Sequence, residues 1–215
     1  MIGVPRLGLE SRHHSLAITV QSIGSALPSA TVMCQLLRSR WVDILLQGST
    51  HCNGDPWCSR GIKIIPDIPS PHEIPDRLVD AADILILPGG APGAKTFCQS
   101  EEVLRLIREF RNEGKWVAAI CAGTTALVES VKSPRADGEA AKKCKVTSHP
   151  SVKQEIVDAG WTYADDSERV VVDGKIITSR GPGTALLFSL TIVEQLAGKA
   201  KKDEVHGPMI CAGTL

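Results

Sequence analysis

Short apolar runs recur along the chain, and polar or turn-forming residues separate them. Runs of this length predict β-strands. The last run differs from the others, because Asp173-Gly174 divides it into two halves and predicts a hairpin turn. The predicted strands are 16–23, 42–47, 62–67, 83–90, 116–121, 145–149 and the two halves of 169–179.

Apolar residues spaced three or four positions apart predict helices between these strands. In the last of them, Thr184 is the expected N-cap and Gly198 the expected terminator. Strands that alternate with helices are typical of βαβ units, so we expect an α/β fold with a parallel sheet. The predicted helices are 29–39, 101–113, 124–130, 151–159 and 184–197.

The segments between these elements predict one domain. Residues 49–61 and 66–76 are rich in turn-forming residues, and 131–144 is a charged insertion that we expect to be a surface loop. None of these segments has the length of an interdomain linker. We therefore expect a poorly structured segment at 1–15 and a single α/β domain over 16–210.

Composition narrows the class of protein. The chain has 215 residues, 43% apolar and 22% charged, which fits one domain with a sizeable core. Its formal net charge is zero and it has no basic stripe, which disfavours nucleic acid as a partner. No apolar run approaches the ~20 residues of a membrane span, and the N-terminus lacks the apolar core of a signal peptide. We expect a cytoplasmic protein, with the nucleus and the mitochondrion as further compartments.

The seven cysteines are expected to be reduced thiols, because no secretion signal precedes them. "HCNGDPWC" at 51–58 has one pair of cysteines and no second pair, so we interpret it as a loop and expect no metal. "ICAGT" occurs at 120–124 and again at 210–214. The second copy has no strand before it, and we interpret Cys211 as a tail residue.

Cys121 in "WVAAICAGTTALV" (116–128) ends a predicted strand and begins a turn into a helix. One interpretation is packing, because free cysteine is among the most buried residue types. The other is a nucleophile at a strand-turn-helix, where the N-terminus of the following helix stabilises the thiolate. The residues alone leave both open.

Residues at three predicted strand ends help to choose between these interpretations, because ligands of parallel sheets bind at the carboxyl ends of the strands. His149 follows one strand in "KVTSHP", and Gly89 and Gly90 follow another in "LPGG". Together with Cys121 and the backbone of Ala122, they would supply a nucleophile, a proton carrier and an oxyanion hole. Taken singly, His149 is equally consistent with a capping residue and "PGG" with a turn.

Four motifs in order, "DILILPGG…GAK", "VAAICAGTTAL", "KVTSHPSVK" and "DGKIITSRGPGTALLF", make the chain resemble the ThiJ/PfpI family. The resemblance spans about residues 42–210 and is strongest to the DJ-one branch, which includes parkinsonism-associated deglycases and fungal glyoxalase III. Related branches place histidine directly after the cysteine or carry a His-x-Glu pair. Here Ala122 follows Cys121, and Ser151 stands two positions after His149.

The resemblance implies a flavodoxin-like three-layer α/β/α sandwich with a mostly parallel sheet, of the class I glutamine amidotransferase-like type, and a homodimer. It implies that Cys121 is the nucleophile and His149 the site histidine. It also implies oxyanion donors at Gly90 and Ala122 and an arginine near the cysteine, Arg60 in "CSRG".

One position departs from the family. The loop after the first strand carries a glutamate in the family, whereas this chain reads "GSALPS" over 24–29, with Ser29 at the place of the acid. We therefore expect a glutathione-independent glyoxalase of the D-lactate dehydratase type that acts on methylglyoxal, without cofactor or metal and with weakened activity. Protein deglycation would use the same site. A cysteine-based redox sensor or chaperone-like protein and a catalytically weak paralogue are the alternatives.

Overall fold

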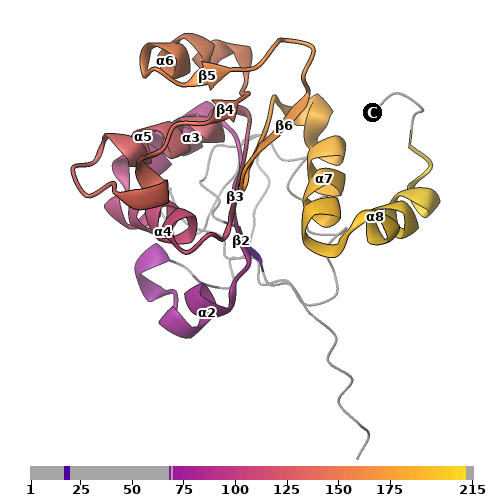
Figure 1. Cartoon of the computed structure of the whole chain (residues 1–215), viewed down its shortest axis with the longest axis horizontal. Helices are drawn as coiled ribbons and strands as arrows, with labels where there is room; N and C mark the ends of the chain where they lie inside the picture. Colours follow the sequence, from indigo (N-terminus) through magenta and orange to yellow (C-terminus); the bar gives the residue numbers. More distant parts are fainter. Residues whose placement is uncertain (1–16, 20–67, 69, 212–215) are drawn as a thin grey trace, which may run out of the picture.

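The structure is a computed structural model that describes residues 17–19, 68 and 70–211. A five-stranded sheet, ordered β1-β2-β3-β7-β6, runs through the middle of this part (Figure 1). Its first four strands are parallel, and β6 runs antiparallel to β7, so the predicted mostly parallel sheet is confirmed. The strands are β1 (Ala17–Thr19), β2 (Ile84–Leu87), β3 (Trp116–Ile120), β6 (Val170–Asp173) and β7 (Ile176–Ser179).

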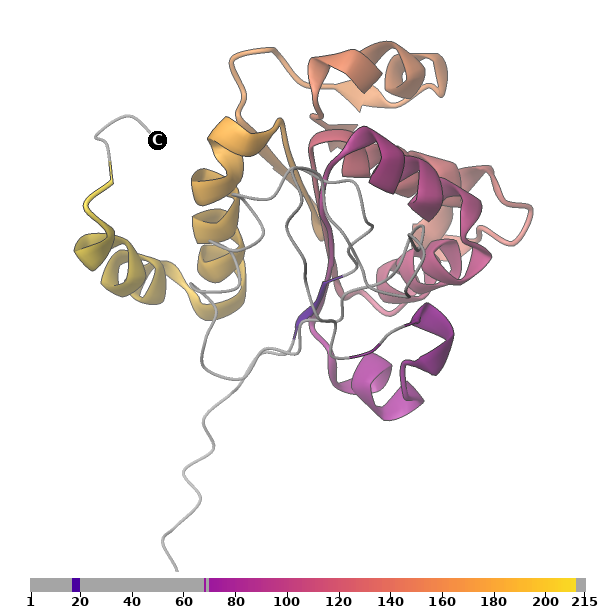
Figure 2. The ribbon, with the colours of Figure 1, turned by 180° about the vertical axis from the view of Figure 1, so that it is seen from behind.

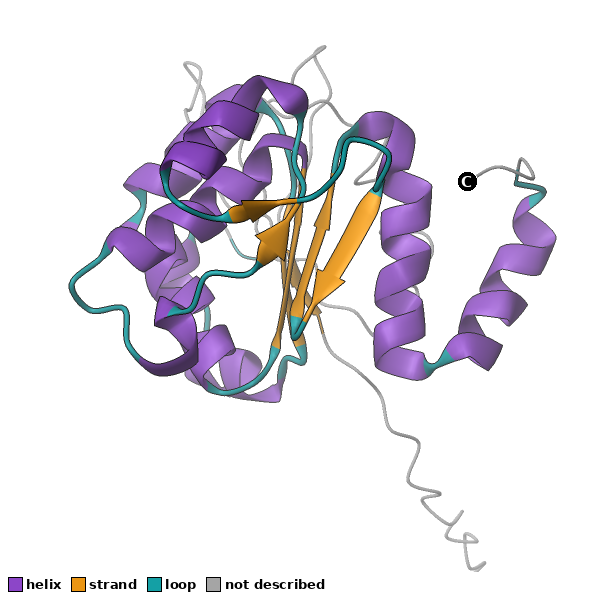
Figure 3. Ribbon diagram, turned by 45° about the horizontal axis from the view of Figure 1, so that its top comes forward, coloured by secondary structure: helices purple, strands orange, loops and turns teal. Residues whose placement is uncertain are grey.

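Helices cover both faces of this sheet, as the predicted sandwich requires. Figures 1 and 2 show α2 to α5 on one side of the strands and α7 on the other, with α8 packed outside α7. The view coloured by secondary structure separates the three layers most clearly (Figure 3). The helices are α2 (Asp76–Ala81), α3 (Ala91–Gln99), α4 (Glu101–Asn112), α5 (Thr124–Lys132), α6 (Lys153–Asp158), α7 (Ala185–Ala197) and α8 (Lys199–His206).

The central strands divide their side chains between two cores. In β2, Leu85 and Leu87 pack with the helices of one layer, whereas Ile84 and Ile86 pack with α7 on the other face. All four side chains are fully buried. This alternation follows from the two-residue period of a strand, and it explains why β2 is apolar at every position.

A small second sheet lies beside α6 and differs from the prediction. The predicted strand at 145–149 forms only over β4 (Lys145–Val146), which pairs in parallel with β5 (Thr162–Tyr163). The next two backbone N–H groups leave the ladder, because Thr147 donates to Thr178 Oγ1 and Ser148 donates to Tyr163 Oη. The predicted strand therefore ends early and releases the chain toward His149.

Among the helices in the described part of the chain, α2, α3 and α8 were not predicted. The start of α3 contains Pro92 and Gly93, which argue against a helix interior, but a proline in the first turn needs no hydrogen-bond donor. The hairpin forms as predicted, although its two turn residues are Gly174 and Lys175, since Asp173 still pairs with Ile176. Thr184 does precede α7, but its side chain caps no α7 amide.

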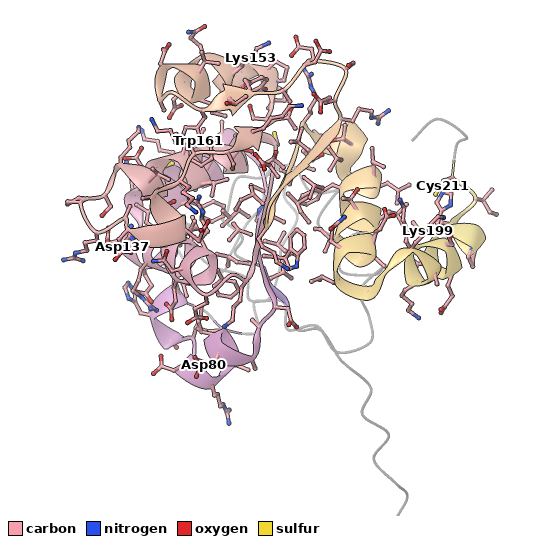
Figure 4. All side chains as sticks on the ribbon, in the orientation of Figure 1. Asp80, Asp137, Lys153, Trp161, Lys199 and Cys211 are labelled. Carbon is pink, nitrogen blue, oxygen red and sulfur yellow. The ribbon has the colours of Figure 1, made fainter. Side chains whose placement is uncertain are left out.

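The charged insertion at 131–144 is a surface segment that hydrogen bonds attach to α4. It contains a short 3-10 helix, Gly138–Ala141, in which Ala140 is buried. The buried guanidinium of Arg111 in α4 donates to the carbonyl oxygens of Ala140 and Lys142. Arg111 also lies over the Trp161 ring, 5.9 Å from its centre (Figure 4 labels Trp161).

Several predictions fall outside the described residues. They are the segment 1–15, the helix 29–39, the strands 42–47 and 62–67, and the loop 49–61. Within the described part, no helix is both long and apolar enough to cross a membrane.

Candidate active site

Cys121 occupies a sharp turn at the carboxyl end of β3. Its backbone φ is 62°, in the left-handed region that residues other than glycine seldom adopt. A 3-10 turn, Cys121–Gly123, follows at once and leads into α5. The side chain is half-buried, at the edge of the core against α7. A strained residue held at a strand-turn-helix is the arrangement expected of an exposed nucleophile.

Two glycines allow this turn to approach the neighbouring strand. A Cβ built on Gly89 would lie 2.4 Å from the Cβ of Cys121 and 3.1 Å from its Sγ. A Cβ on Gly123 would lie 2.6 Å from the carbonyl oxygen of Pro88. The segment after β2 therefore packs backbone to backbone against the cysteine, which requires glycine at both positions.

His149 is joined to the same turn through its main chain. Its backbone N–H donates to the carbonyl oxygen of Cys121, 3.3 Å away. Its side chain caps the 3-10 helix Pro150–Val152, because Nδ1 accepts from the backbone N–H of Ser151. The capping interpretation of His149 is thus confirmed, and a role in chemistry stays a prediction.

The segment that carries His149 is fixed by side chains of neighbouring elements. Tyr163 Oη accepts from the backbone N–H of Ser148 and donates to the carbonyl oxygen of the same residue, at 3.2 and 3.1 Å. Thr124 at the start of α5 donates to the carbonyl oxygen of Thr147 at 3.2 Å. These bonds hold the chain before His149 against β5 and α5.

The loop after β7 reaches the same edge of the sheet. A Cβ on Gly181 would lie 3.6 Å from Cδ2 of His149. Thr184 Oγ1 bonds both the N–H and the carbonyl oxygen of Gly181 and lies 2.6 Å from Ser179 Oγ. The "RGPGT" segment is therefore a closed turn in which the Thr184 hydroxyl bonds the turn backbone and the hydroxyl of Ser179, the residue before the segment.

Charged side chains form ion pairs beside this turn. Asp166 Oδ1 accepts from Arg180 at 3.2 Å and from Lys153 at 3.1 Å, and Figure 4 shows Lys153 on α6 above the sheet. The hydrogen bond from Lys153, its charge and the charge of Arg180 lower the pKa of Asp166. The carboxylate stays ionised at neutral pH and links the loop after β5 to the turn after β7.

The two predicted oxyanion donors come from two strand ends: Gly90 follows β2, and Ala122 follows Cys121 at the end of β3. Gly90 has a φ of 107° and is the N-cap of α3, and Ala122 is buried directly after Cys121. Their role as donors stays a prediction. Arg60 and Ser29, the expected arginine and the position of the family glutamate, lie outside the described residues.

The other described cysteines lie elsewhere. Cys98 in α3 is 3.5 Å from Thr125 Oγ1, and burial raises the pKa of its thiol. Cys144 lies before β4, and burial raises its pKa to about 11. Figure 4 shows Cys211 beyond the end of α8, outside the α7 layer.

No group of three or more His, Cys, Asp or Glu side chains in the described ranges could hold a metal ion. "HCNGDPWC" falls outside those ranges.

Sequence reasoning missed the residues that support His149. Ser148, Ser151 and Tyr163 make its surrounding hydrogen bonds, and none was predicted to do so. Tyr163 is the only tyrosine in the chain, which was a signal that could have drawn attention to it.

Comparison with known proteins shows that the sequence and the fold of this chain are similar to those of one described family. The model of the DJ-1/PfpI family matches residues 36–195. The curated protein dj-1beta of Drosophila melanogaster is 40% identical over 155 residues, which are 72% of this chain and 75% of the relative. The glutathione-independent glyoxalase DJ-1 of Schizosaccharomyces pombe is 39% identical over 138 residues, 62% of this chain and 66% of the relative. The crystal structure of Drosophila melanogaster DJ-1beta superposes with a TM-score of 0.76 at 33% identity, covering 92% of this chain and 98% of that one.

Proposed function

The chain belongs to the DJ-1/PfpI family, and we propose that it is a glutathione-independent glyoxalase that converts methylglyoxal to D-lactate. A relative from Schizosaccharomyces pombe carries the name of this activity. The family match covers residues 36–195 and so includes Cys121, Gly89 and His149.

The observation that carries the proposal is the backbone of Cys121. A φ of 62° costs free energy, and a cysteine that served only to fill the core would not require this backbone conformation. The turn that requires this φ begins at the carboxyl end of β3, next to the end of β2, where ligands of parallel sheets bind. The N-terminal end of the 3-10 turn and α5 supplies backbone dipoles that favour a thiolate.

The reaction adds one water to methylglyoxal. The thiolate of Cys121 forms a C–S bond to the aldehyde carbon, and the carbonyl oxygen becomes a hemithioacetal alkoxide. A proton leaves the former aldehyde carbon and another is added to the adjacent carbon through an enediol, which gives a thioester. Water then cleaves the C–S bond, releasing lactate and the thiol. No electron acceptor is needed, because one carbon is oxidised as its neighbour is reduced.

We assign oxyanion stabilisation to the backbone N–H groups of Gly90 and Ala122, and the likeness to the family adds Arg60 as a cation that favours the thiolate. Removal of one oxyanion donor in an enzyme typically costs about 10²–10³-fold in kcat. Ser29 stands at the position of the family glutamate and cannot carry the enediol proton, so His149 or water takes its place. A slow reaction is therefore expected.

The further assignments are a single domain over 16–210, a homodimer, a cytoplasmic location and a small 2-oxoaldehyde as substrate, with protein deglycation at the same site. The D-lactate dehydratase class follows from the net addition of one water to methylglyoxal and from the D configuration proposed for the product.

The test is turnover of methylglyoxal by the purified full chain without glutathione, with lactate measured by a D-lactate-specific dehydrogenase. Cys121→Ser should abolish lactate formation, because an alcohol is a far weaker nucleophile than a thiolate at neutral pH. Cys98→Ser is the matched control and should retain activity, since Cys98 is held against Thr125 on another helix.

Two outcomes would contradict the proposal: no lactate from a folded chain, or equal lactate from Cys121→Ser. If the folded chain makes no lactate but gains one or two oxygens at Cys121 after mild peroxide, the redox-sensor alternative replaces it.

A further inference from the structure

The imidazole of His149 is bonded at one nitrogen by a single neighbouring residue. Its Nδ1 accepts from the backbone N–H of Ser151 at 3.2 Å and lies 2.8 Å from Ser151 Oγ. Both contacts come from the turn Pro150–Val152, which His149 itself caps.

These contacts decide which ring nitrogen carries the hydrogen. A backbone amide can only donate, so Nδ1 must present its lone pair to it. A neutral imidazole has one N–H group, which then has to be on Nε2. With Nδ1 as acceptor, the Ser151 hydroxyl also donates, and it strengthens the same tautomer.

The main chain that carries the ring is also held in place. The backbone of Ser148 is bonded to Tyr163 Oη, and the N–H of His149 is bonded to Cys121. Gly181 leaves space beside Cδ2, the carbon next to Nε2. Because Nδ1 is occupied, Nε2 is the ring nitrogen that remains for a substrate.

We propose that Ser151 is a positioning residue that holds neutral His149 as the Nε2–H tautomer, so that His149 donates a hydrogen bond and does not take the proton of Cys121. A neutral imidazole can polarise a carbonyl in this way without losing its proton. The thiol proton then goes to water. The assignment of a substrate oxygen as acceptor rests on the proposed function, whereas the tautomer does not.

The tautomer is measured directly on the full chain labelled with ¹⁵N-histidine. Two-bond ¹H–¹⁵N correlations, recorded at a pH where the ring is neutral, distinguish Nε2–H from Nδ1–H. His149→Gln assigns the signals among the six histidines. The Nε2–H pattern is expected, and an Nδ1–H pattern at His149 would overturn the proposal.

Ser151→Ala removes the hydroxyl and keeps the backbone donor. A hydrogen bond of ordinary net strength changes an equilibrium by about two- to tenfold, so the ratio of Nδ1–H to Nε2–H should rise by that factor. Ser151→Thr should restore the ratio. Ser167→Ala is the control, because Ser167 bonds Asp165 and not His149. An unchanged ratio in Ser151→Ala would show that the hydroxyl positions nothing.

Alkylation of Cys121 by iodoacetamide in the absence of substrate tests the second half of the proposal. His149→Gln should leave the rate within about twofold of the parent at each pH, because His149 does not receive the thiol proton. A rate profile displaced toward higher pH would overturn this part. Neither experiment requires turnover, so a chain that shows Nε2–H but makes no lactate contradicts the proposed function and supports the tautomer.

Discussion

A Cβ placed on Gly89 would lie 2.4 Å from the Cβ of Cys121, which is closer than any two such atoms can stand. Gly89→Ala must therefore displace the cysteine turn or the end of β2. We expect a loss of about 1–3 kcal/mol in the free energy of unfolding, measured by urea denaturation, together with loss of turnover.

Gly183→Ala is the control for that substitution. It lies in the turn after β7, where an added Cβ meets nothing within 4 Å. Its stability should change by less than about 0.5 kcal/mol. Equal free energies of unfolding for the two variants would mean that the backbone at Cys121 can move to accommodate the added Cβ without a measurable cost.

Strain at Cys121 should be visible as stability gained by its removal. A left-handed backbone costs an L-residue about 1–2 kcal/mol, whereas glycine loses about 0.4–1 kcal/mol more in unfolded-chain entropy. Cys121→Gly should therefore exceed Cys121→Ala in stability by about 0.5–1 kcal/mol. Thermal and urea unfolding of the two inactive variants provide the comparison, and a less stable glycine variant would contradict the strain.

Cys144 should resist alkylation, because burial raises its pKa from 9.0 to about 11 and the thiolate is the reactive form. A thiol with that pKa has about 100-fold less thiolate near neutral pH than an ordinary one. Burial also raises the pKa of Cys98. Both cysteines are therefore protonated and unreactive below their raised pKa values, and they become reactive thiolates as the pH rises through those values. Peptide mapping after iodoacetamide at pH 7.5 (about neutral) should find label at Cys121 and little at these two. Equal labelling of all three would refute it.

The buried guanidinium of Arg111 should control the order of the charged insertion. Arg111→Met removes charge-assisted bonds to the carbonyl oxygens of Ala140 and Lys142, and we expect a loss of about 2–4 kcal/mol. Hydrogen exchange over 133–144 should accelerate in this variant.

Arg105→Met is the comparison on the same helix. Arg105 is exposed and pairs with Glu102 and Glu109, and such pairs contribute about 0–1 kcal/mol. Insertion exchange that is equally fast in both variants would assign the effect to α4 as a whole.

The sequence predicted the central elements well because their patterns are local. The run Trp116–Ile120 is apolar and short, and it forms β3 as expected. The start of α4 has Ser100 as an N-cap that accepts from Val103, again a local signal. The charged helix α8 has no apolar stripe, so its position against α7 could not be predicted from periodicity.

Long-range hydrogen bonds explain the larger misses. The strand after Lys145 ends because Thr178 and Tyr163 take the amides of Thr147 and Ser148, and both partners lie more than ten positions away in the sequence. The same holds for the site. Cys121 and His149 could be singled out by their neighbours in sequence, whereas the support from Tyr163 depends on how β5 pairs with β4.

The division of β3 between two cores restricts where this chain can change in length. Val117 and Ala119 pack on one face and Ala118 and Ile120 on the other, and Cys121 comes next. Because side chains alternate, inserting or deleting one residue in β3 would exchange the two sets and turn the thiol away from its present side. Length variation is therefore expected outside β3, because the number of residues in this strand sets the direction in which the thiol points.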